Sequence, residues 1–289
     1  MYTIKWVAEH LGVPTGTLRA WEQRYDIVHP ARTEAGYRIY SDADLATLTA
    51  MTRLVETGIQ PAQAAEQIRH RPRALTVQPH RPDEAPPGLP SPHALIAASR
   101  TYDVEALENI LDTAFSQAGF EYVIDHWLTT AMTDVGEAWA RGDLDISHEH
   151  VISAAVMRRL SAAFDAAGHA PLGMHILTGL APGATHEIAT LAFATMLRRA
   201  GLQVTYLGPD LPAASWVEAA RTTRPDAVVI AAPRKTDTPA ATHVTQALHQ
   251  ATPQTPLYIG GPDTPPEHTL QGPTLTHMRD SLIAALNRR

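Results

Sequence analysis

The sequence predicts a multidomain chain that combines an N-terminal winged helix-turn-helix, a four-helix bundle and a C-terminal α/β Rossmann-like parallel sheet. Three observations predict this fold class. Residues 1–75 hold helical patterns around a short two-strand pattern, and residues 93–168 space their apolar side chains at helical intervals. From Met174 onward, strand and helix patterns alternate, which is the order of a parallel sheet with helices on both faces.

A proline-rich stretch separates the first of these regions from the others. Residues 76–92 contain six prolines, which exclude a helix there and indicate an extended linker. A length of 289 residues is enough for two or three domains. We expect a DNA-binding domain over 1–75, the linker over 76–92, the bundle over 93–168 and the α/β domain over 169–289.

Composition and charge narrow the kinds of site that the chain can carry. The absence of cysteine excludes disulfides, thiolate zinc sites, iron–sulfur clusters and cysteine nucleophiles. No apolar run reaches the length of a membrane span and no secretory signal is seen, so we expect a cytoplasmic protein without a membrane partner. The net charge is −7, but residues 1–75 have nine Lys/Arg against eight Asp/Glu, so the acidity lies elsewhere.

The first residues have the pattern of a helix-turn-helix. A helix over 2–10, a tight turn and a second helix over 17–25 are the pair that places one helix in the major groove of DNA. Two short strands joined through Gly36 predict a wing. Ser41 is a natural N-cap for a longer helix over about 41–70.

The run from Leu18 to Tyr40 reads Leu-Arg-x-Trp-Glu-x-Arg-Tyr and then Arg-Thr-x-x-Gly-Tyr-Arg-x-Tyr. This run resembles the MerR family, and the resemblance covers about a quarter of the chain. It implies a regulator that binds double-stranded operator DNA as a dimer. The dimer helix of that family normally follows the wing helix, where this chain has its proline-rich stretch. We therefore expect the C-terminal regions to form the homo-oligomer, a dimer or a tetramer.

The resemblance and physical chemistry assign DNA contacts to the same side chains. Guanidinium groups on the second helix can reach phosphates or a guanine edge, and the wing suits contacts to the backbone and the minor groove. The expected DNA-binding residues are Thr15, Thr17, Arg19 and Arg24 on the second helix and Arg32, Tyr37 and Arg38 on the wing. Because aromatic burial dominates small cores, we expect Trp21 in the interior, and Tyr25 and Tyr40 are further candidates for the core.

The rest of the chain predicts a bundle and then a sheet. The expected bundle helices begin near Leu95 and continue over 104–115, 120–139 and 147–167, and their short connections favour a four-helix bundle. The expected strands of the sheet are 175–178, 204–207, 226–231 and 257–260. The expected helices between and after them are 187–200, 213–222, 240–251 and about 278–286.

In the bundle region, Trp139 is followed ten residues later by Glu149 and His150. This spacing resembles the bundle half of cobalamin-binding modules, as in the CarH/LitR type of light-responsive MerR regulators. The resemblance implies that the three side chains cover the upper face of adenosylcobalamin. A flat indole can pack over the deoxyadenosyl group, and a carboxylate can accept hydrogen bonds from the ribose hydroxyls.

In the α/β region, residues 182–189 follow the first expected strand and open the first helix, at the switch point where such sheets bind ligands. They resemble the Asp/Glu-x-His-x-x-Gly motif of cobalamin-binding domains. The resemblance implies that His186 is the metal ligand, which binds cobalt from below and displaces the dimethylbenzimidazole tail. It also implies that Gly260 and Gly261 let that tail lie against the backbone.

Four alanines depart from these family patterns. Ala184 stands in place of the acidic residue that orients the ligating histidine, and Ala189 replaces the motif glycine. Ala231 stands where a serine often meets the buried benzimidazole. Ala140 follows the tryptophan, where the CarH type has the histidine that captures cobalt after photolysis. The substitutes for that second ligand would be water, His148 or His150.

Three hypotheses remain open at this point. The first is a repressor, with no catalytic residues, in which adenosylcobalamin and light set the oligomeric state and so the DNA affinity. The second is a MerR-type regulator with a degenerate pocket that senses another ligand or uses cobalamin without light. The third is the corrinoid carrier of a methyltransferase, which the DNA-binding region and the lack of a nucleophile–base pair argue against.

Overall fold

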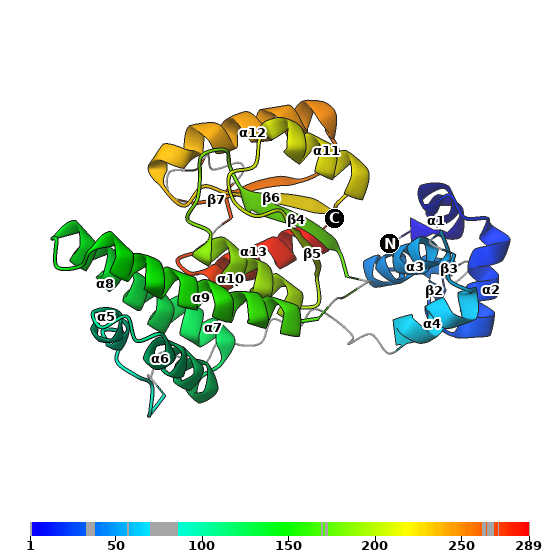
Figure 1. The fold of residues 1–289 in the computed structure, drawn as a ribbon. Coiled ribbons are helices and arrows are strands. Elements are labelled where there is room, and N and C mark those ends of the chain that lie inside the picture. Colours follow the sequence, from blue (N-terminus) through cyan, green and yellow to red (C-terminus); the bar gives the residue numbers. More distant parts are fainter. Residues whose placement is uncertain are drawn as a thin grey trace. The chain divides into compact units, whose positions relative to one another are not determined.

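The computed structural model describes residues 2–32, 38–56, 58–69, 86–168, 170, 173–261, 264, 269–270 and 272–288. Contacts divide the chain into two compact units, Met1–Leu75 and Thr76–Arg289. Figure 1 labels the helices and strands of both units. Within these described ranges, no helix is both long enough and apolar enough to cross a membrane.

The N-terminal unit is a winged helix-turn-helix, as predicted. Helices α1 (Ile4–Leu11) and α2 (Thr15–Tyr25) are separated by a turn at Gly12, where a φ of 66° suits glycine. Strands β1 (Tyr2–Thr3), β2 (Ala31–Arg32) and β3 (Arg38–Tyr40) form an antiparallel sheet with β3 in the middle. Of the aromatic side chains expected in the interior, Trp21 and Tyr40 are buried and Tyr25 is half-buried.

Two expectations for this unit are wrong in their boundaries. The first helix begins at Ile4 rather than Tyr2, because the two preceding residues pair with β3 as the unpredicted strand β1. The single helix expected over 41–70 is two helices, α3 (Asp42–Glu56) and α4 (Pro61–Arg69). The chain turns between them at Gly58, whose φ is 89°, and proline opens the second helix.

The second unit begins with the predicted four-helix bundle. Its helices are α5 (Ala94–Ser99), α6 (Val104–Gln117), a third helix in three parts, and α9 (Ile146–Ala166). The third helix consists of α7 (Phe120–Tyr122), a π-helical segment (Val123–Leu128) and α8 (Thr129–Ala140). Leucine, valine and isoleucine side chains from all four fill a shared core, including Leu95, Leu111, Val135 and Ile152. The helical spacing of the sequence therefore predicted the bundle, but not the π-helical turn.

The α/β domain has the predicted parallel sheet. Its strands are β4 (His175–Leu180), β5 (Gln203–Tyr206), β6 (Ala227–Ala231) and β7 (Leu257–Gly260), in the order β5-β4-β6-β7. Helices α10 (Ile188–Arg199) and α13 (Leu275–Asn287) cover one face, and α11 (Ala213–Thr223) and α12 (Thr238–Ala251) cover the other (Figure 1). From β4 the chain first adds β5 on one side and then adds β6 and β7 on the other side. The carboxyl ends of the neighbouring strands β4 and β6 therefore form the switch point.

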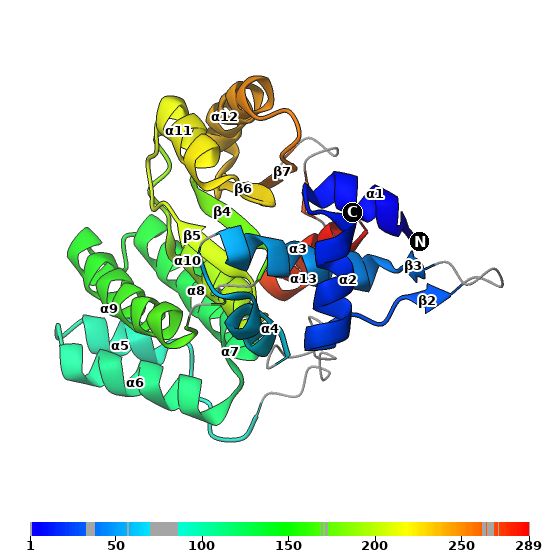
Figure 2. The same cartoon turned by 90° about the vertical axis from the view of Figure 1, so that its right-hand side faces the viewer.

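The bundle and the α/β domain are joined through α9, α10 and α13, which lie side by side in both views (Figures 1 and 2). Asp125 of the π-helical segment accepts hydrogen bonds from the backbone N–H groups of Leu275 (3.0 Å) and Thr276 (3.3 Å), which are the first residues of α13. Glu121 pairs with Arg199 at 3.1 Å and with the buried Arg279 at 3.4 Å. These contacts fix the bundle against the sheet that carries His186.

Candidate functional site

His186 lies on the loop that follows β4, at the carboxyl edge of the sheet, and its side chain is exposed. Asp210, from the loop after β5, holds this loop in place. The Asp210 carboxylate accepts from the Gly183 N–H at 2.7 Å, and the Asp210 N–H donates to the Ala184 carbonyl at 3.0 Å. Two neighbouring strand ends thus fix the backbone from which His186 projects.

The imidazole of His186 has a cationic partner. A guanidinium nitrogen of Arg234 lies 2.7 Å from Nδ1 of His186. Arg234 follows β6, and Asp237 fixes its backbone by one hydrogen bond in each direction, both of 2.9 Å. Asp237 itself is only 7% exposed. Arg234 was not among the predicted site residues, because the sequence indicates the strand before it but not the strand order that places it beside His186.

Glu187, the next residue along the loop, is also engaged. Its carboxylate accepts a hydrogen bond of 2.9 Å from the hydroxyl of Tyr206 at the end of β5. Burial, together with this bond, raises the pKa of Tyr206 well above its ordinary value. Glu187 therefore serves to anchor the loop to β5.

The two predicted glycines differ in their surroundings. A side chain at Gly260, the last residue of β7, would meet no atom within 4 Å, so this position leaves open space at the edge of the sheet. Gly261 has a φ of 155°, and a side chain there would collide with the backbone carbonyl of Ala232. Gly261 is therefore needed for close backbone packing, whereas only Gly260 offers room to a ligand.

On the bundle, the predicted upper-face residues lie on adjoining helices. Trp139 near the end of α8 is 51% exposed, which is unusual for such a large apolar side chain. Glu149 on α9 accepts from the Ser153 hydroxyl at 2.6 Å and pairs with Nδ1 of His150 at 2.5 Å. The carboxylate is thus held in one orientation before any ligand binds.

The two histidines considered as substitutes for a second cobalt ligand are not equivalent. Nδ1 of His148 accepts from the Asp145 N–H at 3.1 Å as part of a capping box for α9, and its ring stacks on Tyr102 at 4.8 Å. His150 has its Nδ1 on the Glu149 carboxylate and is largely exposed. A carboxylate on one imidazole nitrogen is the usual support for a metal ligand, so the geometry favours His150 over His148.

In the N-terminal unit, the predicted DNA-binding residues fall into three groups. Arg19 and Arg24 on α2 and Arg32 on β2 are exposed, and Thr15 and Thr17 at the start of α2 are half-buried. Arg38 differs from the other arginines, because its Nε donates to both carboxylate oxygens of Glu22, at 2.7 and 3.1 Å. This hydrogen bond raises the pKa of Arg38. Tyr37 lies outside the described residues.

The sequence matches three family descriptions. Residues 2–70 match the MerR HTH family regulatory protein, and residues 93–163 and 174–275 each match a B12 binding domain. The HTH-type transcriptional repressor CarH of Myxococcus xanthus is 33% identical over 267 residues, which cover 90% of this chain and 88% of CarH. The chain belongs to the CarH-like MerR regulators.

Two further relatives show how the similarity is distributed along this CarH-like regulator. The HTH-type transcriptional repressor CarA of Myxococcus xanthus is 29% identical over 260 residues, covering 89% of this chain and 85% of CarA. The Dimethylamine corrinoid protein 3 of Methanosarcina acetivorans is 30% identical over 142 residues, or 48% of this chain and 64% of that protein. The relatives that cover most of the chain are therefore named repressors, and the corrinoid protein matches about half of it.

The donor set of this CarH-like regulator fits a corrinoid better than a free metal ion. In the part of the chain that the structure describes, no group of three or more His, Asp or Glu side chains is placed to hold a metal. A corrinoid brings its own ring ligands for cobalt, so it asks the protein for no cluster of ligands, and a single exposed imidazole such as that of His186 fits this demand. The exposed Trp139 and the preorganised Glu149 add an apolar surface and an acceptor.

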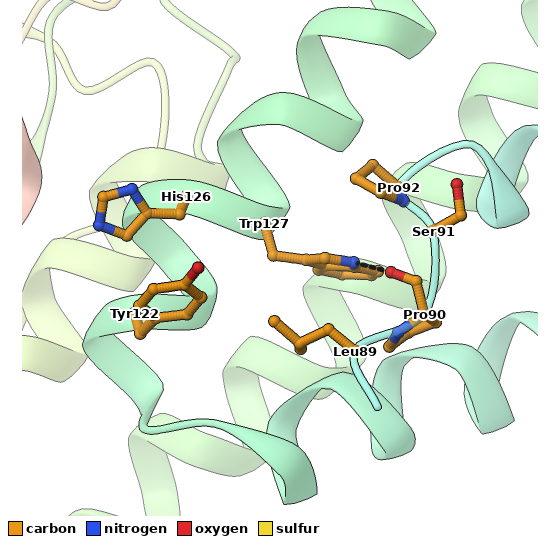
Figure 3. A pocket seen from close by; sticks show the side chains of 7 residues that line it. All are labelled: Leu89, Pro90, Ser91, Pro92, Tyr122, His126 and Trp127. Carbon is orange, nitrogen blue, oxygen red and sulfur yellow. Dashed lines mark hydrogen bonds between the residues drawn. The ribbon is translucent and has the colours of Figure 1, made fainter. Parts of the chain in front are cut away.

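A separate cavity of about 310 Å³ lies at the start of the bundle (Figure 3). Leu89–Pro92 form one wall, and Tyr122, His126 and Trp127 form the other. The indole N–H of Trp127 donates to the Pro90 carbonyl at 2.7 Å and ties the two walls together. None of the predicted site residues lines this cavity, so it belongs to the packing of the bundle against the incoming chain.

Proposed function

We propose that this protein is a transcriptional repressor whose affinity for operator DNA responds to adenosylcobalamin and light. The observation that carries the proposal is the similarity to CarH, a transcriptional repressor, over 90% of the chain. That span includes both the helix-turn-helix region and the two B12-binding regions. A sensor and a DNA-binding domain on one chain need no further partner to couple the two activities.

Each compositional region of the chain has its own role in the proposal. Residues 1–75 bind the operator, and the proline-rich residues 76–92 link them to the rest of the chain. Residues 93–168 form the cobalamin cap, and residues 169–289 form the cobalamin-binding α/β domain. On the DNA side, the exposed Arg19, Arg24 and Arg32 provide the charge for phosphate and base contacts. Thr15, Thr17, Tyr37 and Arg38 complete the proposed contact set.

On the cofactor side, the proposal gives each face of the corrin its own residues. When bound, adenosylcobalamin supplies a light-sensitive cobalt–carbon bond. His186 offers an imidazole nitrogen to the lower face, and Gly260 and Gly261 line the path of the nucleotide tail. Trp139 offers an apolar surface to the upper face, while Glu149 and His150 offer an acceptor and a second imidazole.

The link from cofactor to DNA is proposed to be assembly. Two or four linked DNA-binding domains raise the affinity for a repeated operator through effective concentration, without any new contact to DNA. A cofactor that stabilises the homo-oligomer therefore raises operator affinity, and loss of the adenosyl group lowers it. The bundle carries Trp139 and Glu149 and packs on α10, so a change at the upper face would act first on the bundle.

One alternative is favoured by specific observations. The Nδ1 atom of His186 is bound to Arg234 rather than to a carboxylate, and Ala184, at the position of the family's acidic residue, is fully buried. These features suit a regulator with a degenerate pocket that uses cobalamin without light, or takes another ligand. This alternative predicts that illumination leaves the operator affinity unchanged, even where light cleaves the cobalt–carbon bond of a bound corrinoid.

The test is a spectrum followed by a binding assay. The purified protein is incubated with adenosylcobalamin in darkness, desalted, and its absorbance recorded before and after green light. We expect the corrinoid to remain with the protein and its spectrum to change on illumination, with a fall in operator affinity. Retention of the corrinoid with an operator affinity that light does not change would favour the alternative, and loss of the corrinoid on desalting would refute the cofactor.

A further inference from the structure

We propose that Arg234 controls the availability of His186 to cobalt, by holding the imidazole in the tautomer that cannot ligate through Nε2. This inference rests on the cobalamin-binding function proposed above. Arg234 is thus a further positioning residue of the site, acting through His186. The contact that carries the inference is the 2.7 Å hydrogen bond between the guanidinium and Nδ1 of His186.

The topology of the sheet creates this contact. His186 follows β4 and Arg234 follows β6, and these strands are neighbours on either side of the switch point. Both ends of the contact are supported, since Asp210 clamps the loop before His186 and the buried Asp237 pins the backbone of Arg234. The fold therefore brings these two exposed side chains within reach of each other.

The chemistry of the two groups fixes the direction of the hydrogen bond. A guanidinium has donors and no acceptor, so Nδ1 of His186 must accept. A neutral imidazole that accepts at Nδ1 has its proton on Nε2. A protonated Nε2 has no lone pair to offer to cobalt, and Nδ1 is covered by Arg234. Ligation through either nitrogen therefore requires the guanidinium to leave.

In the described part of the chain, the carboxylates of the loops around His186 have other hydrogen-bond partners. Metal-ligating histidines usually donate their second nitrogen to a carboxylate or a backbone carbonyl. Position 184 is a buried alanine, and the Glu187 carboxylate accepts from Tyr206. Asp210 and Asp237 accept from the backbone N–H groups of Gly183 and Arg234. The charge beside His186 is therefore positive, which is the opposite of the family's acidic residue.

The cost of releasing His186 is that of one exposed hydrogen bond to a charged group. Because water surrounds both side chains, the net contribution falls below that of a buried bond to a charged group and corresponds to about a two- to tenfold change in an equilibrium constant. We therefore expect Arg234→Ala to bind adenosylcobalamin about two- to tenfold more tightly than the unmodified protein. Arg221→Ala, which removes an exposed arginine from α11 in the same domain, is the matched control and is expected to leave the affinity unchanged.

Two readouts test the inference in the full-length protein. The first needs no cofactor: the ring nitrogen shifts of His186, assigned by comparison with His186→Ala, report its tautomer in nuclear magnetic resonance spectra. We expect a proton on Nε2 in the unmodified protein and a mixture of tautomers in Arg234→Ala. A ring of the unmodified protein that carries its proton on Nδ1 would overturn the inference.

The second readout is a double-mutant cycle on adenosylcobalamin affinity. If Arg234 acts through His186, Arg234→Ala tightens binding in the parent chain and has no effect in the His186→Ala chain. Equal or weaker binding by Arg234→Ala in the parent chain would overturn the inference. Failure of every variant to bind a corrinoid would refute the cofactor and with it the role toward cobalt, whereas the ring shifts would still decide whether Arg234 sets the tautomer.

Discussion

The hydrogen-bonded pair of Arg38 and Glu22 gives a way to distinguish the effect of Arg38 on the stability of the helix-turn-helix unit from its effect on DNA binding. Arg38 lies on β3 and Glu22 on α2, and their side chains are only 20% and 17% exposed. Replacing Arg38 by alanine leaves a largely buried carboxylate without the donor that satisfies both of its oxygens. Hydrogen bonds to charged groups contribute about 1.5–3 kcal/mol, and the remaining access of water reduces this. We expect Arg38→Ala to lower the free energy of unfolding of this unit by about 1–2 kcal/mol.

Arg24→Ala is the matched variant, because Arg24 lies on the same helix as Glu22 but is exposed. We expect it to leave stability unchanged and to reduce the salt dependence of operator binding by about one phosphate contact. Arg38→Ala is expected to weaken operator binding by about 1–3 kcal/mol and to lower stability as well. The loss of stability arises from the link between the wing and α2, and not from DNA.

The assays are hydrogen exchange over residues 2–56 and operator titrations at several salt concentrations. Glu22→Gln is expected to destabilise the unit about as much as Arg38→Ala, and the double variant little more than either, since all three remove the same pair. An Arg38→Ala protein with unchanged exchange and unchanged operator affinity would refute both the structural role of the pair and the assignment of the wing to DNA binding.

Three further predictions concern the second unit. Asp125→Ala leaves the N-cap Thr274 in place but removes the acceptor of the first two backbone N–H groups of α13, and it is expected to lower the free energy of unfolding in urea by about 1–2 kcal/mol. The raised pKa of Tyr206 means that the folded state keeps its proton after the unfolded state has lost it. The contribution of Tyr206 to stability is therefore constant below pH 10.0, the ordinary pKa of tyrosine, and falls as the pH rises above it, so the alkaline loss of stability is less steep in Tyr206→Phe. Trp139→Ala is expected to keep the fold, since its side chain is half-exposed, but to reduce adenosylcobalamin retained after desalting.

Each of these predictions has a control. Asp134 on α8 is not at a helix start, so Asp134→Ala is expected to cost less than Asp125→Ala, and equal costs would contradict the capping role. If Tyr206→Phe lost as much stability at alkaline pH as the parent protein, the loss would come from other groups. For the cofactor, the control is Ile146, a second exposed apolar residue of the bundle. If Ile146→Ala reduced corrinoid retention as much as Trp139→Ala, the indole would have no special role.

Local patterns in the sequence predicted those helices and strands whose formation depends on their own residues. The helical spacing of 93–168 and the strand–helix alternation after Met174 gave the bundle and the sheet. The predictions that were wrong concern features that local patterns did not reveal. Strand β1 exists because Tyr2 pairs with Tyr40, a contact across the unit that no local pattern encodes. The break at Gly58 was encoded, but the apolar period continues across it and concealed the turn.

In the candidate site, too, residues identified by a local motif were predicted and residues brought in by the fold were not. His186 could be found from a motif, because the residues that identify it are its neighbours in sequence. Arg234 lies far along the chain, and only the strand order β5-β4-β6-β7 places the end of β6 beside the end of β4. Likewise, the motif identifies Arg38 as a wing residue, but its engagement by Glu22 depends on how β3 packs on α2.

Three of the four alanines in the cobalamin motifs are therefore expected to differ in their consequences. Ala184 and Ala231 belong to the proposed lower face, where Arg234 contacts His186 and a side chain at Gly260 would meet no atom within 4 Å. Ala140 belongs to the proposed upper face, where His150, supported by Glu149, remains exposed. Substitutions at the lower face should govern how tightly the corrinoid is held, and those at the upper face how the protein responds once light has acted. We therefore expect corrinoid retention and the response to light to vary independently. Arg234→Ala should change how tightly the corrinoid is retained, and His150→Ala should change the response of the protein to light.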